Sequence, residues 1–169
     1  MGPVTTKFAK VDPGPSQTFG WLGFGISGVG IVLVLVSFTA VIWERDGHFK
    51  FADLRHLVDR LETSPLTHVY PVAKAYFTWL AWVLLIVAAV CAVLAATPAI
   101  SAPFRVITPL VAVAGIALTF VAIDIFAGPG YSMWIKSARP GFYLAVIGFL
   151  LVGVGSALGT NREHRPALR

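Results

Sequence analysis

The charged residues of this chain are gathered into short stretches, and four long windows between them contain no Asp, Glu, Lys or Arg. These windows separate Asp12 from Glu44 (31 residues), Lys74 from Arg105 (30), Arg105 from Asp124 (18) and Arg139 from Arg162 (22). A membrane-spanning helix needs roughly 18 to 20 predominantly apolar residues, so each window can hold one span. The pattern predicts a polytopic membrane protein and excludes the soluble fold classes.

Composition agrees with this assignment. Hydrophobic residues make up 57% of the 169 residues and charged residues only 12%, whereas a soluble domain has about 25% charged residues. We expect an all-α fold of four transmembrane helices at about 19–43, 72–96, 104–127 and 141–159. A flexible polar tail (1–18) would precede this domain (19–160), and a basic tail (161–169) would follow it. Four spans use nearly the whole length, so no separate catalytic domain is expected.

The first apolar run, from Phe19 to Trp43, has 25 residues. A signal peptide has an apolar region of only about 7 to 15 residues, so this run is interpreted as an uncleaved first span. Trp21 and Trp43 stand near its two ends, where tryptophan rings favour the lipid headgroup level.

A short amphipathic helix is predicted at about 51–62, between the first two spans. Its apolar residues recur on one side of a helix and are Phe51, Leu54, Leu57, Val58 and Leu61. Pro65 should end it. The apolar side could lie on lipid or on protein. Helices that lie on a bilayer surface usually carry excess Lys and Arg, and this helix is nearly charge-balanced, which favours protein.

The remaining boundaries are marked by proline and glycine. Pro71 can begin the second span, the short connection 97–103 predicts a tight hairpin, and Gly128-Pro129-Gly130 should end the third span. An even number of spans places both tails on one side. That side carries six Lys and Arg and the other side seven, so the positive-inside rule does not decide the orientation. The basic tails favour cytoplasmic termini.

Small residues crowd the first and fourth spans. The helix-packing candidates are Gly20, Gly23, Ser27, Gly28, Gly153, Gly155 and Gly159. Small residues let helix backbones approach closely in a membrane, within one chain or against a partner, and the pattern does not separate these alternatives. The same region matches G-x-G-x-x-G at 23–28 and resembles an intramembrane protease nucleophile motif at Ser27. Neither fits, because the spans contain no histidine base and no strand precedes the glycines.

Asp124 is the acid that lies closest to a span interior, four residues before Gly128. A charge at bilayer depth is costly and therefore marks a functional hypothesis. Three roles are open: a boundary residue paired with Lys74, Lys136 or Arg139, a contact with another subunit, or a handler of protons or ions.

Other chemistry is poorly supported by the sequence. Cys91 is the only cysteine, and the four histidines (His48, His56, His68 and His164) fall outside the spans and lack metal-site spacing. No basic face suited to nucleic acid is visible. We therefore expect no enzyme activity, no cofactor, no metal site and no nucleic-acid partner.

Five features of the sequence are shared with a known group of membrane proteins. They are the Ala/Val/Gly/Leu-rich spans, the preference for Arg over Lys, the tail from Asn161 to Arg169, the helix at 51–62 and the Gly128-Pro129-Gly130 break. In these features the chain resembles actinobacterial four-span accessory membrane subunits, such as those of the mycobacterial Mce-type lipid importer. The resemblance implies a bacterial inner-membrane accessory subunit in lipid or fatty-acid import, with permease-type chains and membrane lipids as partners. A respiratory supercomplex subunit and a small independent transporter that uses Asp124 are the alternatives.

Overall fold

A computed structural model describes residues 17–18, 20–43, 49–62, 71–127, 140–158 and 161–162, with side chains from 20–43, 49–60, 71–123 and 140–158. The elements are β1 (Gln17–Thr18), α1 (Trp21–Thr39), α2 (Phe51–Glu62), α3 (Pro71–Ala75), the π-helix η1 (Tyr76–Leu80), α4 (Ala81–Ala96), α5 (Ser101–Ala127), α7 (Pro140–Leu158) and β2 (Asn161–Arg162). Four helical stretches are long and apolar enough to cross a membrane, and α2 is a short helix between the first two. The predicted fold class is confirmed, and the chain is a multi-pass membrane protein.

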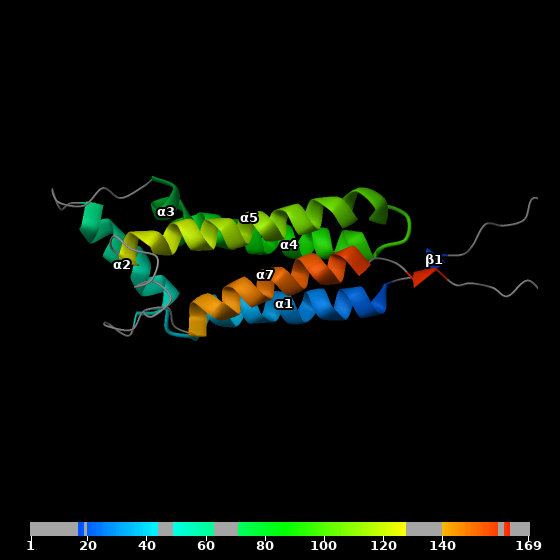
Figure 1. Cartoon of the computed structure of the whole chain (residues 1–169), viewed down its shortest axis with the longest axis horizontal. Coiled ribbons are helices and arrows are strands. Elements are labelled where there is room, and N and C mark those ends of the chain that lie inside the picture. Colours follow the sequence, from blue (N-terminus) through cyan, green and yellow to red (C-terminus); the bar gives the residue numbers. More distant parts are fainter. Residues whose placement is uncertain are drawn as a thin grey trace, which may run out of the picture.

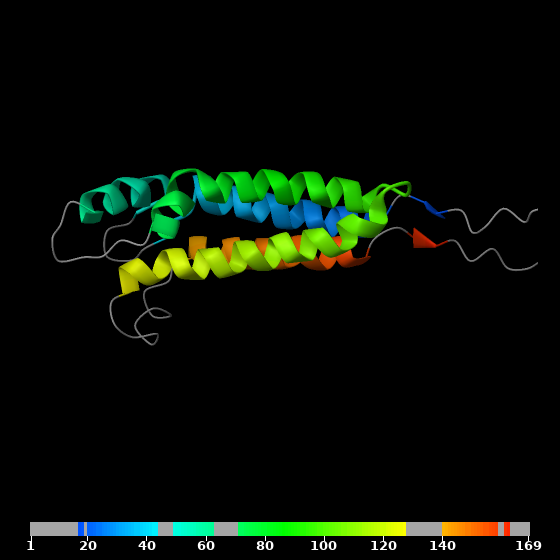
Figure 2. The same cartoon turned by 90° about the horizontal axis from the view of Figure 1, so that it is seen from above.

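The four spans form an elongated bundle in which α1 lies beside α7 and α4 beside α5 (Figures 1 and 2). The helices α1 and α7 have 19 residues each, whereas the second span runs over 26 residues and α5 over 27. At 1.5 Å per residue the first two are about 28 Å long and the other two about 40 Å. The longer pair therefore overhangs at one end, and α2 lies in the step that this overhang leaves (Figure 1).

The two chain ends meet at the opposite end of the bundle. Strand β1 pairs antiparallel with β2, with Gln17 opposite Arg162 and Thr18 opposite Asn161. This pairing places β1 and β2 at the same end of the bundle (Figure 1), as an even number of spans requires. Residues 1–16 and 163–169 lie outside the described part, as does the Gly128-Pro129-Gly130 break.

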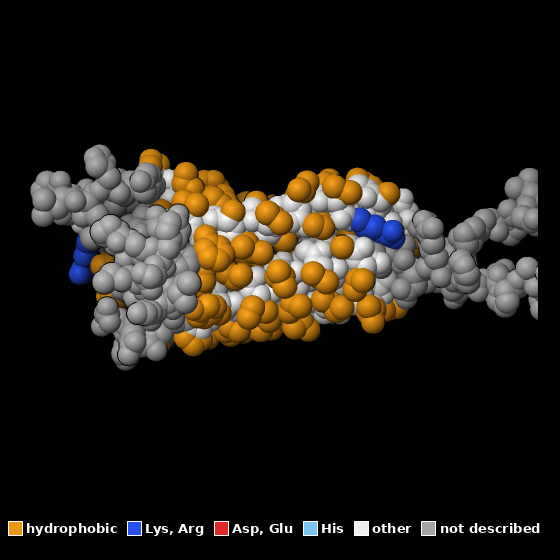
Figure 3. Space-filling model, viewed as in Figure 1, with side chains coloured by type: hydrophobic (Ala, Val, Ile, Leu, Met, Phe, Trp, Pro, Cys, Tyr) orange, Lys and Arg blue, Asp and Glu red, His pale blue; other side chains and the backbone are white. Residues whose placement is uncertain are grey.

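Apolar side chains cover the middle of the bundle, and basic side chains lie near both of its ends in the view of Figure 3. Trp21 is 72% exposed, and its position at the headgroup level stays a prediction. The expectation for Trp43 was wrong. The helix α1 ends at Thr39, and the chain beyond it folds back so that Trp43 is fully buried in protein.

Candidate interaction site at the α2 end of the bundle

The apolar side of α2 packs on protein. Phe51, Leu54 and Val58 are 2%, 1% and 1% exposed, and Leu57 is half-buried. The side chain of Leu61 lies outside the described residues. Of the two alternatives that the sequence left open, packing on protein is the one observed. The outer side of α2 is left to solvent or to another molecule.

Beneath α2 lies an aromatic cluster, which consists of Phe38, Trp43, Phe51, Tyr76 and Phe77. The Phe51 ring stacks on Phe38 with centroids 4.4 Å apart, and its centroid lies 5.2 Å from that of Trp43. It also contacts Phe77 at 5.3 Å and Tyr76 at 6.0 Å. Aromatic pairs of this kind contribute about 0.5–1.5 kcal/mol each beyond the area they bury. Phe51 therefore joins α2 to both α1 and the second span.

Hydrogen bonds tie the aromatic cluster to the start of α7. The indole Nε1 of Trp43 donates to the carbonyl of Ser37 (2.8 Å), and the Ser37 hydroxyl donates to the carbonyl of Gly141 (2.6 Å). The backbone N–H of Gly141 in turn donates to the carbonyl of Ile42 (3.1 Å). A Cβ at Gly141 would overlap the Trp43 ring. Glycine at position 141 therefore allows the close approach on which this junction depends.

The N-terminus of α2 is fixed by backbone and side-chain contacts. The N–H of Trp43 donates to the carbonyl of Phe49 (2.8 Å), and Ile42 pairs antiparallel with Lys50. The carboxylate of Asp53 accepts a hydrogen bond from the N–H of Lys50 (3.0 Å), as an acidic residue in the first turn of a helix commonly does. The exposed side of α2 then presents Ala52, Asp53, Arg55, His56, Asp59 and Arg60.

Lys74 is the one predicted ion-pair residue whose side chain is described. Its ammonium lies 3.9 Å from the carboxylate of Asp59 on α2, and both side chains are about half-exposed. The pair joins α3 to α2, a connection that the sequence did not suggest. Lys136, Arg139 and the side chain of Asp124 lie outside the described residues, so their proposed pairing remains a prediction.

The backbone of α5 nevertheless places position 124. Val106, Val113 and Ala117 lie eighteen, eleven and seven residues before it, which puts all four positions on one helical row. The three earlier residues are exposed. Position 124 also lies one turn beyond Phe120, whose ring contacts Phe142 near the start of α7. Position 124 therefore belongs to the last turns of α5, near the overhanging end of that helix.

A buried polar pair joins the second and third spans. The hydroxyls of Tyr76 and Thr119 are 2.6 Å apart, and Thr119 also donates to the carbonyl of Gly115 (2.7 Å). Both side chains are completely buried. Because the Thr119 proton is directed to Gly115, the Tyr76 hydroxyl is the donor in the pair. Neither residue is among the predicted site residues, because their apolar neighbours give no signal of a pair 43 positions apart.

Three of the seven predicted small residues, Gly23, Ser27 and Gly155, pack against one another between α1 and α7. A Cβ on Gly155 would lie 2.6 Å from the carbonyl oxygen of Gly23 and 2.5 Å from the Ser27 hydroxyl. The Ser27 hydroxyl donates to the carbonyl of Val152 (3.3 Å). Gly153 faces α5 instead, where a Cβ would lie 3.2 Å from that of Ala112.

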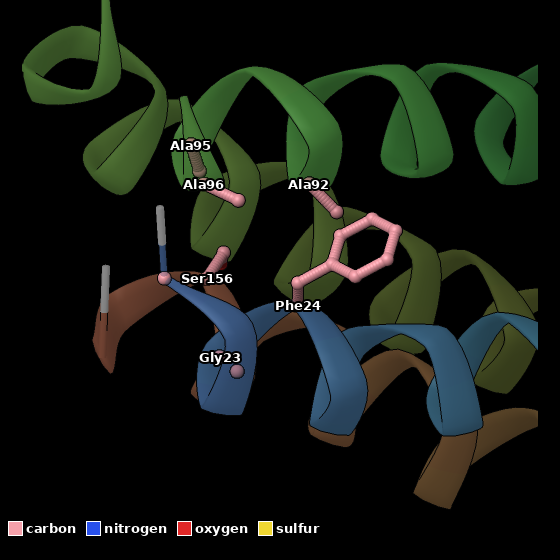
Figure 4. A pocket seen from close by; sticks show the side chains of 8 residues that line it. Gly23, Phe24, Ala92, Ala95, Ala96 and Ser156 are labelled. Atoms are coloured by element: carbon pink, nitrogen blue, oxygen red, sulfur yellow. The ribbon is translucent and has the colours of Figure 1, made fainter. Parts of the chain in front are cut away.

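Of the remaining predicted glycines, Gly20 and Gly28 have different surroundings. A Cβ on Gly28 would meet nothing within 4 Å, so this residue serves no packing contact within the described chain. Gly159 lies outside the described residues, and Gly20 is buried. Gly20 and Gly23 line a narrow crevice with Phe24, Ala92, Ala95, Ala96, Gly155 and Ser156. Figure 4 shows the Phe24 ring reaching from α1 towards Ala92 of α4.

Four glycines at close contacts lie outside the predicted set, and they are Gly30, Gly115, Gly141 and Gly148. Gly30 meets Gly148 between α1 and α7, and Gly115 lies under the Phe149 ring between α5 and α7. A signal for the first pair was present, because Gly30 lies seven residues after Gly23 and Gly148 seven before Gly155. Two turns of helix separate residues seven apart, so each pair lies on one side of its helix.

The described residues contain no group of three or more His, Cys, Asp or Glu that could hold a metal ion. Cys91 is buried in α4 as a free thiol. No protein-family model, curated protein or solved structure matches the chain. The α2 end therefore stands as a candidate surface for binding another molecule, on its geometry alone.

Proposed function

We propose that this protein is a non-enzymatic accessory subunit that stabilises or regulates a larger membrane complex. The observation that carries the proposal is the contact of Gly30 with Gly148. Gly30 is the middle residue of α1, and Gly148 lies next to the middle of α7. Transporters commonly bind substrate near the membrane midplane, between discontinuous helices. Here the middle of the α1–α7 pair is occupied by backbone packed on backbone.

The α2 end supports the same proposal. The apolar residues Phe51, Leu54 and Val58 of α2 are buried inside the protein, and its described charged residues are exposed. The helix lies at the end of the bundle where the longer spans overhang (Figure 1). Exposed charges of both signs, such as Arg55 and Asp53, suit a polar protein surface better than a lipid surface. We propose that the partner contacts this surface.

The partner class follows from the resemblance in the sequence. We propose permease-type chains of a lipid or fatty-acid importer in a bacterial inner membrane, with both tails in the cytoplasm. Chains of a respiratory supercomplex are the alternative partners. A small transporter that depends on Asp124 is a third alternative.

Co-purification from the native membrane in a mild detergent, followed by mass spectrometry, tests the proposal. A subunit should recover a fixed set of chains in constant ratio to the tagged protein. Permease and substrate-binding chains would indicate import, whereas cytochromes would redirect the proposal to respiration. Recovery of this chain alone, at normal expression, would contradict a subunit role. If Asp124→Asn then abolished a transport activity of the purified protein, the transporter alternative would replace it.

A matched pair of variants locates the contact. Arg55→Glu with His56→Glu changes the exposed side of α2 and should lower partner recovery, because complementary charges steer and hold protein contacts. Ile86 of α4 is 61% exposed on the apolar surface around the middle of the bundle. Ile86→Ala should leave the recovery of the partner unchanged. Equal recovery with both variants would move the contact away from α2.

A further inference from the structure

The helix that runs from Pro71 to Ala96 is not uniform. Between Tyr76 and Leu80 it widens into a π turn, in which the N–H of Ala81 donates to the carbonyl of Tyr76, five residues earlier. In a regular α-helix the acceptor is four residues earlier, so the turn holds one extra residue. The segment before the turn is therefore rotated by about 100° from the place where an uninterrupted α-helix would put it.

The extra residue decides which side chains enter the core. Ala73, Tyr76 and Ala81 are each completely buried. If Ala81 stayed in place and the helix before it had no π turn, every earlier residue would shift by one position. Phe77 would then take the place of Tyr76, and Lys74 would take the place of Ala73. The second exchange would put an ammonium group where no surface is exposed, which is strongly unfavourable. The first would leave Thr119 without the tyrosine hydroxyl.

The contacts of α2 depend on the same register. In the π register Lys74 reaches Asp59 of α2, and Tyr76 and Phe77 present their rings to Phe51. The Thr78 hydroxyl donates to the carbonyl of Lys74 (2.8 Å), which supplies a hydrogen bond within the widened part of the helix. A shift by one residue would carry Lys74 away from Asp59 and put Phe77 and Thr78 in the places of Tyr76 and Phe77, so the Phe51 ring would lose one aromatic neighbour.

We propose that Lys74 is a positioning residue that locks the register of the second span and thereby keeps α2 docked. Its charge excludes the uninterrupted register, so the π turn persists and Tyr76 stays on Thr119. In this role the ion pair with Asp59 is secondary. The charge of Lys74 acts because it cannot enter the buried position that Ala73 occupies, which makes the uninterrupted register unfavourable. The lock is a property of this chain alone and does not depend on the proposed subunit role.

A buried reporter on α2 tests the lock. Leu54, which is 1% exposed, is changed to Cys in a Cys91→Ala background, and the rate of maleimide labelling is measured on the purified full chain. Lys74→Met removes the charge and keeps the length of the side chain. It should populate the uninterrupted register and raise the labelling rate about tenfold or more, as expected when a minor state becomes common. Asp59→Asn removes only the ion pair and should leave the rate close to that of the parent.

Deletion of Thr78 shows whether Lys74 acts on the helix register or in some other way. Without one residue the π turn becomes a regular α turn, and Ala73 and Tyr76 keep their places in the core. Lys74→Met combined with this deletion should therefore return to the slow labelling of the parent. The proposal is overturned if the combined variant labels as fast as Lys74→Met, or if Lys74→Met labels no faster than the parent. It is also overturned if Asp59→Asn matches Lys74→Met. Should Lys74→Met fail to fold, the deletion alone decides, because a fast rate there contradicts the register assignment.

Discussion

Gly30 of α1 faces Gly148 of α7 so closely that a Cβ on Gly30 would lie 2.5 Å from the carbonyl oxygen of Gly148. A Cβ on Gly148 would in turn lie 2.7 Å from the carbonyl oxygen of Gly30. Lipid gives helices no hydrophobic drive to associate, so close packing at small residues is a main source of stability. This contact is the centre of the α1–α7 pair.

Gly148→Ala should destabilise the bundle. The added methyl meets backbone on the facing helix, and overpacking of this kind costs about 1–3 kcal/mol. Thermal unfolding in a fixed detergent, followed by circular dichroism, measures the loss. The matched control is Gly25→Ala, where a Cβ would meet nothing within 4 Å. We expect the control to unfold at or slightly above the parent temperature, and equal losses in both variants would contradict the packing assigned here.

Ser37→Ala should weaken the junction between α1 and α7 more than Ser27→Ala does. The Ser37 hydroxyl lies 2.6 Å from its acceptor, the carbonyl of Gly141, whereas the Ser27 hydroxyl lies 3.3 Å from the carbonyl of Val152. Hydrogen bonds between membrane helices contribute about 0.6 kcal/mol on average and at most about 1.7. The order of the two unfolding temperatures checks the prediction, and a reversed order would refute it.

Phe51→Ala should release α2 while leaving the four spans folded. The substitution removes the ring that α2 shares with Phe38 and Tyr76, and the loss of a buried Phe costs about 3–5 kcal/mol. Hydrogen exchange should then become faster across α2 but not across α1 or α7. Arg55→Ala, on the exposed side of the same helix, serves as the control and should leave exchange unchanged.

Thr119→Val and Tyr76→Phe should be coupled. Thr119→Val leaves the buried Tyr76 hydroxyl without its acceptor, which costs about 1–3 kcal/mol. Removing both hydroxyls leaves no orphan, so the double variant should be less destabilised than the sum of the single variants. A double-mutant cycle of unfolding free energies measures this difference. Strict additivity would show that the 2.6 Å contact contributes nothing.

Much of the fold could be predicted because the membrane imposes a simple rule on the sequence. Charge-free windows located all four spans, and the one-sided stripe from Phe51 located α2 with the bounds that the structure has. The end of the first span was misplaced because the apolar run continues to Trp43. Hydropathy does not distinguish a residue that faces lipid from one buried by a returning chain.

The site was harder to predict because it depends on contacts distant in sequence. The Ser37–Gly141 bond joins residues 104 positions apart, and neither residue departs from the composition around it. The π turn also lacks a compositional mark. The sequence indicates the π turn only indirectly. Lys74 lies seven residues before Ala81, so in a regular helix it would lie on the same buried side as Ala81. Such a conflict between charge and helical period is the signal that could have located it.

The central claim is that the exposed side of α2 meets a partner in the membrane complex. A photo-crosslinking amino acid at position 56, which is exposed on α2, tests this claim in living cells. The same group at position 86, on the apolar surface of α4, gives the background. We predict one dominant protein adduct at position 56, of constant mass and lost in the Arg55→Glu variant. Adducts with lipid alone at both positions would contradict the claim.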